Sequence, residues 1–170
     1  DSYRKDTSLL LGRSLDFEFV EKIEDFAVHE FAAQSSKGVP QQFCLAIERS
    51  KFSLDRVVEG MQKKEDYRYN EEMRNRYMNK VCVVLRLLAK AIRHFHKEGL
   101  VHGDICQETC GKFDDKWKLT NLLGSQEKGQ LFARSRFGES SPPEAVDIRQ
   151  DVPCFRDLEA LPSVDIWAFG

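Results

Sequence analysis

A helical repeat of apolar residues in the middle of the chain constrains the fold more than any other feature. The repeat consists of Val81, Val84, Leu85, Leu88, Ile92 and Phe95. Their spacings, mostly of three or four residues, place them on one face of a helix, which we expect to be buried. Gly99 follows at the position where a left-handed residue commonly ends a helix. The sequence therefore predicts a buried helix that begins near Val81 and stops before Leu100.

Two runs rich in β-branched and aromatic residues precede this helix, at residues 19–30 and 42–48. The polar turn at residues 34–40, which contains Gly and Pro, separates them, so we expect an antiparallel hairpin. Ser53 then stands before an apolar stretch and is predicted to begin a short helix. The charged and aromatic residues 67–77 have no clear period and are predicted to form an exposed insert. These elements together indicate an α+β fold.

The composition of the chain narrows its class. Its 170 residues are 41% hydrophobic and 32% charged, which is typical of one globular domain or part of one. No apolar run reaches the ~20 residues needed to cross a bilayer, so we expect no membrane association and a cytoplasmic or nuclear location. A net charge of -2 does not favour nucleic-acid binding. The five cysteines are odd in number and lack a CxxC pair, which favours reduced thiols.

Four short motifs stand in a fixed order along the second half of the chain. They are His102-Gly103-Asp104, the run 118–124 (Lys-Leu-Thr-Asn-Leu-Leu-Gly), Pro142-Pro143-Glu144, and the run 165–170 (Asp-Ile-Trp-Ala-Phe-Gly). Each motif alone is weak, but four in this order at these intervals are much stronger. From residue 19 to residue 170 the chain resembles the eukaryotic protein kinase family.

The resemblance implies a bilobal protein kinase-like fold. Residues 1–48 would be a remnant of the small lobe. Residues 49–170 would form the hinge, the catalytic loop, the activation segment and the start of the central helix of the large lobe. The chain begins at Asp1 and stops inside that helix, so we expect a fragment of the domain. The glycine-rich loop and the strand lysine of the family have no counterpart in these residues.

The resemblance also assigns chemistry to particular residues. Asp104 stands at the position of the catalytic aspartate, which accepts or orients the proton of the acceptor hydroxyl; a solvated turn residue is the alternative interpretation. Thr109 and Asn121 stand at the two metal-binding positions. A hydroxyl is a poorer ligand than an amide carbonyl, and an amide lacks the charge of a carboxylate, whereas Mg²⁺ is held chiefly by carboxylates and phosphates. Binding of ATP and Mg²⁺ is therefore expected to be weakened or lost.

The end of the second predicted strand corresponds to the hinge that contacts adenine. Ile47 would lie at the back of the nucleotide pocket, and Glu48 and Ser50 would offer backbone groups to the base. The alternative is that these residues simply end a strand. A metal site at residues 102, 106 and 110, a His and two Cys spaced by four residues, is a weaker hypothesis because a fourth ligand is not evident.

The resemblance also predicts structural roles for several residues outside the proposed catalytic and nucleotide-binding groups. Gly103 replaces an arginine that usually pairs with a phosphorylated activation loop, so control by such a phosphate is not expected. Asp165 would hydrogen-bond the catalytic-loop backbone, and Trp167 would pack in the large lobe. Glu144 would close the activation segment. Residues 134–162 are predicted to form a long loop with short helical pieces.

Three functions follow from this resemblance. The first is a degenerate kinase (pseudokinase) that acts as a regulatory or binding module, since three chemical groups of the family are replaced. The second is an active serine/threonine protein kinase with divergent metal ligands, since Asp104 is retained. The third is a small-molecule phosphotransferase, which is ranked last because relatives of that type lack the last two motifs. In the first two cases the partners or substrates would be proteins; the oligomeric state is left open.

Overall fold

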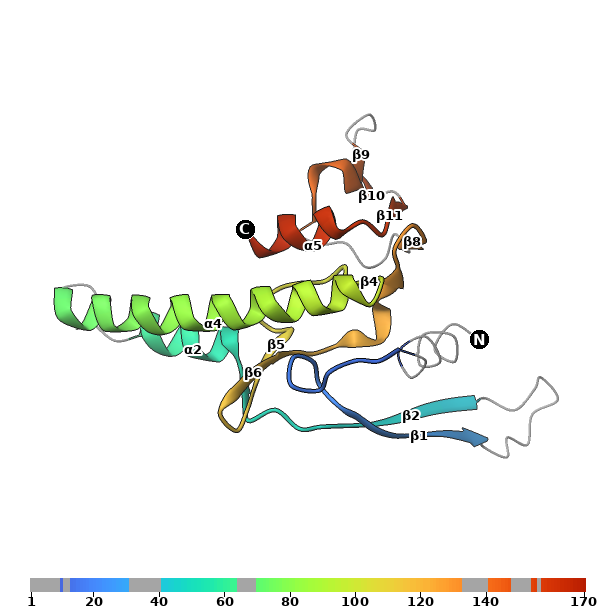
Figure 1. The fold of residues 1–170 in the computed structure, drawn as a ribbon, viewed down its shortest axis with the longest axis horizontal. Coiled ribbons are helices and arrows are strands. Elements are labelled where there is room, and N and C mark those ends of the chain that lie inside the picture. The colour runs from blue at the N-terminus through green and yellow to red at the C-terminus, as the bar shows by residue number, and fades with distance from the viewer. Residues whose placement is uncertain are drawn as a thin grey trace.

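The computed structural model describes residue 10 and residues 13–30, 41–63, 70–132, 141–147, 154–155 and 157–170. These residues form helices and small antiparallel sheets, which confirms the α+β class (Figure 1). The longest helix, α4, runs through the middle of the molecule. The hairpin β1–β2 lies on one side of α4, and the C-terminal elements lie on the other.

The predicted hairpin is present. Strands β1 (Ile23–Glu30) and β2 (Gln41–Ile47) pair antiparallel, with Phe26 opposite Leu45, and an irregularity between Ile23 and Asp25 shifts the register. The predicted turn at residues 34–40 lies outside the described residues.

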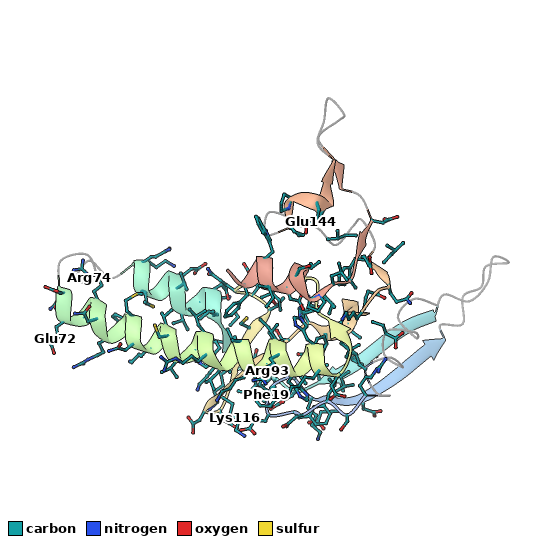
Figure 2. The ribbon with its side chains drawn as sticks, turned by 45° about the horizontal axis from the view of Figure 1, so that its top comes forward. Phe19, Glu72, Arg74, Arg93, Lys116 and Glu144 are labelled. Atoms are coloured by element: carbon teal, nitrogen blue, oxygen red, sulfur yellow. The ribbon has the colours of Figure 1, made fainter. Side chains whose placement is uncertain are left out.

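Two helices follow the hairpin. Strand β3 (Phe52–Ser53) leads into α2 (Leu54–Gln62), whose N-cap is Ser53 as predicted. Helix α4 (Glu71–Lys97) begins ten residues before Val81, so residues 71–77 are mostly exposed as predicted but belong to the helix and not to a separate insert. Asn70 explains this early start, because its side chain accepts a hydrogen bond from the backbone N–H of Met73 at 3.1 Å and so caps the helix. The side chains of this first turn are mostly exposed, and Figure 2 shows Glu72 and Arg74 at the end of α4 that projects from the molecule.

Burial along α4 is uneven. Leu88, Ile92 and Phe95 are buried as predicted, whereas Val81 and Val84 are only partly buried and Leu85 is exposed. The apolar face is therefore covered over the C-terminal half of the helix alone. Gly99 has a φ of +76° directly after the helix, as predicted for its end. Although α4 has 27 residues, no helix in the described part of the chain is long and apolar enough to cross a membrane.

A small sheet supports the loop that follows α4. After β4 (Leu100–Val101) come β5 (Cys110–Phe113) and β6 (Lys116–Leu119), which form a three-stranded sheet in the order β3-β5-β6. The 3-10 helix η1 (Leu122–Gly124) leads to β7 (Gln126–Glu127), which pairs with β4. The main core lies between this sheet and α4. Its buried members include Val20, Leu88, Ile92, Phe95, Leu100, Ile105, Leu119 and Leu122.

The C-terminal elements are short. They are β8 (Leu131–Phe132), η3 (Pro143–Ala145), β9 (Val146–Asp147), β10 (Cys154–Phe155), β11 (Leu158–Glu159) and α5 (Pro162–Phe169). Between residues 134 and 162, the described parts thus hold one short helical piece, as predicted, and also short strands. Helix α5 lies beside α4 (Figure 1). Trp167 on α5 is 55% exposed, so the prediction that it packs inside the lobe is wrong for this structure.

Candidate functional site: the loop that carries Asp104

The loop after β4 is ordered by the buried side chain of His102. Its Nε2 atom lies 2.9 Å from the carbonyl oxygen of Thr120, and its Nδ1 atom accepts the backbone N–H of Asp104 at 3.2 Å. A carbonyl can only accept and a backbone N–H can only donate, so these partners require a neutral imidazole protonated on Nε2. His102 therefore fixes the start of the loop to the end of β6, one residue before Asn121.

Asp165 holds the same loop from α5. Its side chain is 1% exposed; Oδ1 accepts the backbone N–H of Gly103 at 2.7 Å, and Oδ2 accepts that of His102 at 2.9 Å. The Nε2 atom of His96, near the end of α4, lies 2.8 Å from Oδ2. These are the backbone hydrogen bonds expected of Asp165. Asp165 lies in the first helical turn of α5, and the N-cap of this helix is Leu161.

Asp104 and Asn121 are brought together, although they come from different segments. The Asn121 amide donates to Oδ2 of Asp104 at 3.3 Å. Asn121 has a φ of +61°, a left-handed conformation that asparagine tolerates better than most residues. Glu21 supports this conformation, because its Oε1 accepts the backbone N–H of Asn121 at 2.6 Å.

Glu21 is a buried carboxyl that the sequence did not single out. Burial raises the pKa of Glu21 above its ordinary value of 4.5, and the nearby charge of Glu48 raises it further, while hydrogen bonds from the backbone of Leu122 and Asn121 lower it. Glu21 is thus an internal acceptor for the turn that carries Asn121. A lone acidic residue next to an apolar strand gives too weak a signal to assign this role from the sequence.

Thr109, the second predicted metal ligand, is buried in the loop itself. Its hydroxyl donates toward the carbonyl oxygens of Asp104 at 2.8 Å and Cys106 at 3.1 Å, and it accepts the backbone N–H of Cys106 at 2.9 Å. The structure therefore places the Thr109 hydroxyl as a brace of the loop, and its role as a metal ligand stays a prediction. Among the described residues there is no group of three or more His, Cys, Asp and Glu side chains that could hold a metal ion.

The three predicted nucleotide-binding residues lie at the end of β2. Ile47 is 47% exposed, and its place at the back of a nucleotide pocket stays a prediction. The Glu48 carboxylate is paired with Lys118 of β6, Nζ to Oε2, at 2.6 Å. Ser50 is partly buried. The backbone N–H of the next residue, Lys51, donates to the carbonyl oxygen of Lys112 at 2.7 Å. This segment is thus tied to the sheet by one ion pair and by backbone bonds.

The Glu48–Lys118 pair also escaped the sequence analysis. Lys118 is nearly buried, and its ammonium group lies 4.9 Å from the centre of the Phe113 ring. A buried lysine needs such partners, because removing its charge from water without them is costly. The only sequence signal is a lysine within a short strand pattern, which does not identify its partner.

A cavity of about 550 Å³ lies beside the loop that carries Asp104. Helices α2, α4 and α5 line it together with the loop, and Leu54, Leu85, Cys106 and Phe169 are among its lining residues. None of the three predicted nucleotide-binding residues lines this cavity.

No protein-family model matches the chain, and no curated protein compared with it matches either.

Proposed function

We propose that the chain is part of a protein kinase-like domain whose phosphoryl transfer is impaired and which acts as a regulatory or binding module for other proteins. One observation carries the proposal. Asp104 faces the amide of Asn121 at 3.3 Å, where a phosphotransferase of this family would have a metal-binding carboxylate next to the catalytic aspartate. The amide satisfies Asp104 but offers Mg²⁺ no negative charge.

The kinase-like part of the proposal is supported by the connections around the loop. His102 and Asp165 hold the backbone on either side of Gly103, and β5–β6 leads from the loop to Asn121. In the proposed bilobal domain, β1–β2 belongs to the small lobe, and α4 and α5 belong to the mainly helical large lobe. These contacts are specific to the residues that carry the family resemblance.

The proposed impairment of phosphoryl transfer is also supported by Thr109 and Gly103. The Thr109 hydroxyl is occupied by three backbone groups of its own loop. Gly103 has no side chain with which to bind a phosphorylated segment. We expect that loss of a single transition-state contact of ~3 kcal/mol lowers a rate by more than a hundredfold.

Thermal unfolding with ATP alone and with ATP plus Mg²⁺ tests this proposal. We expect no Mg²⁺-dependent stabilisation of the natural chain. The variant Asn121→Asp should gain it, because the new carboxylate keeps the shape of the side chain and supplies the negative charge that Mg²⁺ prefers. A ligand at about one hundred times its Kd adds ~2.7 kcal/mol, which raises Tm by about 5–10 °C for a chain of this size.

The matched control is Asn79→Asp, which adds the same charge on an exposed position of α4 and should gain no response. Mg²⁺-dependent stabilisation of the natural chain, with phosphate transfer to protein that Asp104→Ala abolishes, would overturn the impaired assignment and favour an active kinase. Absence of a response in Asn121→Asp would contradict the assignment of residue 121 as a metal-binding position.

A further inference from the structure

The loop that carries Asp104 meets one aromatic ring from a distant segment. Gly103 has a φ of +76°, and a Cβ atom placed on it would lie 2.5 Å from two carbon atoms of the Phe132 ring. Atoms of this kind do not approach so closely, so the ring occupies the space of any side chain at position 103. Glycine is required here twice, by the backbone conformation and by the ring.

Phe132 is the centre of a second apolar core. It is fully buried, and this core also contains Val101, Ala145, Ala160 and Val164. These residues come from β4, η3, the end of the β11 segment and α5. One ring therefore connects the catalytic-like loop with several segments that are distant in the sequence.

The strand that carries Phe132 is itself held in place. Phe132 is opposite Leu158 in the β8–β11 pair, and the backbone N–H of Ala160 donates to the carbonyl of Gln130 at 2.7 Å. The loop at Gly103 is also fixed, because the backbone N–H groups of His102 and Gly103 donate to Asp165. The contact thus joins two segments that are each anchored elsewhere.

We propose that Gly103 and Phe132 form an apolar clasp through which β8 and β11 fix the backbone next to Asp104 without any phosphate group. An arginine–phosphate pair forms only after modification and is weakened by salt. A contact between a buried ring and a glycine backbone needs neither charge, so the clasp is closed in the unmodified chain. This inference goes beyond the proposed function and does not depend on it, since it concerns the coupling of two segments and not phosphoryl transfer.

Amide hydrogen exchange, resolved by residue with NMR, tests the clasp. Phe132→Ala should lower protection of the His102 and Gly103 amides at least tenfold while protection of the Ile92 amide in α4 changes less than about twofold. Phe17→Ala, the same change at an exposed phenylalanine, should leave all three amides unchanged. Unchanged protection of the amides at residues 102 and 103 would overturn the proposal. So would an equal fall in protection of the Ile92 amide, because that result indicates general destabilisation.

A second pair of variants separates the ring from backbone strain. Gly99 also has a φ of +76°, but a Cβ atom placed there would meet nothing within 4 Å. Gly103→Ala should therefore lower protection of the His102 amide at least tenfold more than Gly99→Ala does. In a Phe132→Ala background, the two alanine substitutions should agree within about twofold. If Gly103→Ala is as mild as Gly99→Ala, or if its excess effect persists without the ring, the clasp is refuted.

Discussion

Replacement of Asp165 by alanine should strongly destabilise the fold. This carboxylate is 1% exposed and accepts the backbone N–H groups of His102 and Gly103 at 2.9 and 2.7 Å, while His96 Nε2 lies 2.8 Å from it. Alanine would leave two buried backbone donors and one imidazole nitrogen without this partner. The structure offers no other acceptor in the contacts described for these two N–H groups.

The size of the effect follows from the kind of bonds that are lost. A hydrogen bond to a charged group contributes about 1.5–3 kcal/mol, and a buried donor left without its partner costs about 1–3 kcal/mol. Because such terms are not additive, we expect a loss of about 4 kcal/mol for Asp165→Ala. Asp165→Asn keeps one acceptor but points an NH2 group at a backbone donor, so we expect a loss of about 2 kcal/mol.

Urea denaturation followed by circular dichroism measures these losses as changes in the free energy of unfolding. Asp115→Ala, at an exposed position in the β5–β6 turn, is the control and should change the value by less than about 0.5 kcal/mol. A loss below about 1 kcal/mol for Asp165→Ala, or a larger loss for asparagine than for alanine, would refute this account of the carboxylate.

Three further predictions concern groups away from Asp165. Burial raises the pKa of Glu21, so its contribution to stability is complete below pH 4.5 and is lost as the pH rises through the folded value. Glu21→Gln should therefore gain stability relative to the natural chain as the pH rises above 4.5 in paired urea titrations, and a constant difference would contradict the shift. Burial raises the pKa of Cys110 to about 12, so iodoacetamide should label exposed Cys82 in the native chain and spare Cys110, as mass spectrometry can show; equal labelling would disprove this. Asn70→Ala removes the acceptor for the Met73 N–H and should cost about 1 kcal/mol in urea denaturation, whereas an unchanged value would rule out the cap.

Local sequence signals predicted the elements whose structure depends on neighbouring residues. The β-branched runs gave the β1–β2 hairpin, and Gly99 marked the end of α4 because a left-handed residue suits glycine. Motif order also led to the contact between Asp165 and the backbone of residues 102 and 103. In that case the resemblance supplied a long-range pairing that periodicity alone cannot give.

The features that the sequence did not predict depend on packing between distant segments. An apolar period shows that Leu85 shares a face with Leu88, but the packing of other segments against α4 decides which part of that face is covered. Trp167 is exposed for a related reason, because no described segment covers that side of α5. The pairing of Lys118 with Glu48 joins residues from separate strands, and neither residue carries a local signal for the other.

The early start of α4 is a different kind of miss. Periodicity was absent from residues 71–77 because that turn buries no side chain, yet a helix forms there. The Asn70 cap and the acidic residues Glu71 and Glu72 favour its start through local hydrogen bonding and the helix dipole. At this point of the chain, the capping residues predict the start of the helix better than the hydrophobic pattern does.

The geometry of the loop and its chemistry have separate causes. His102, Thr109 and Asp165 fix the backbone around Asp104 with hydrogen bonds that need neither a metal ion nor a phosphate. The contact between Asn121 and Asp104 is exposed and 3.3 Å long, so breaking it to admit a metal would cost no more than an ordinary hydrogen bond, about 1 kcal/mol. Under the proposed function, the missing negative charge at residue 121 is the larger obstacle to Mg²⁺. The proposed loss of phosphoryl transfer is therefore compatible with a loop that keeps all of these hydrogen bonds.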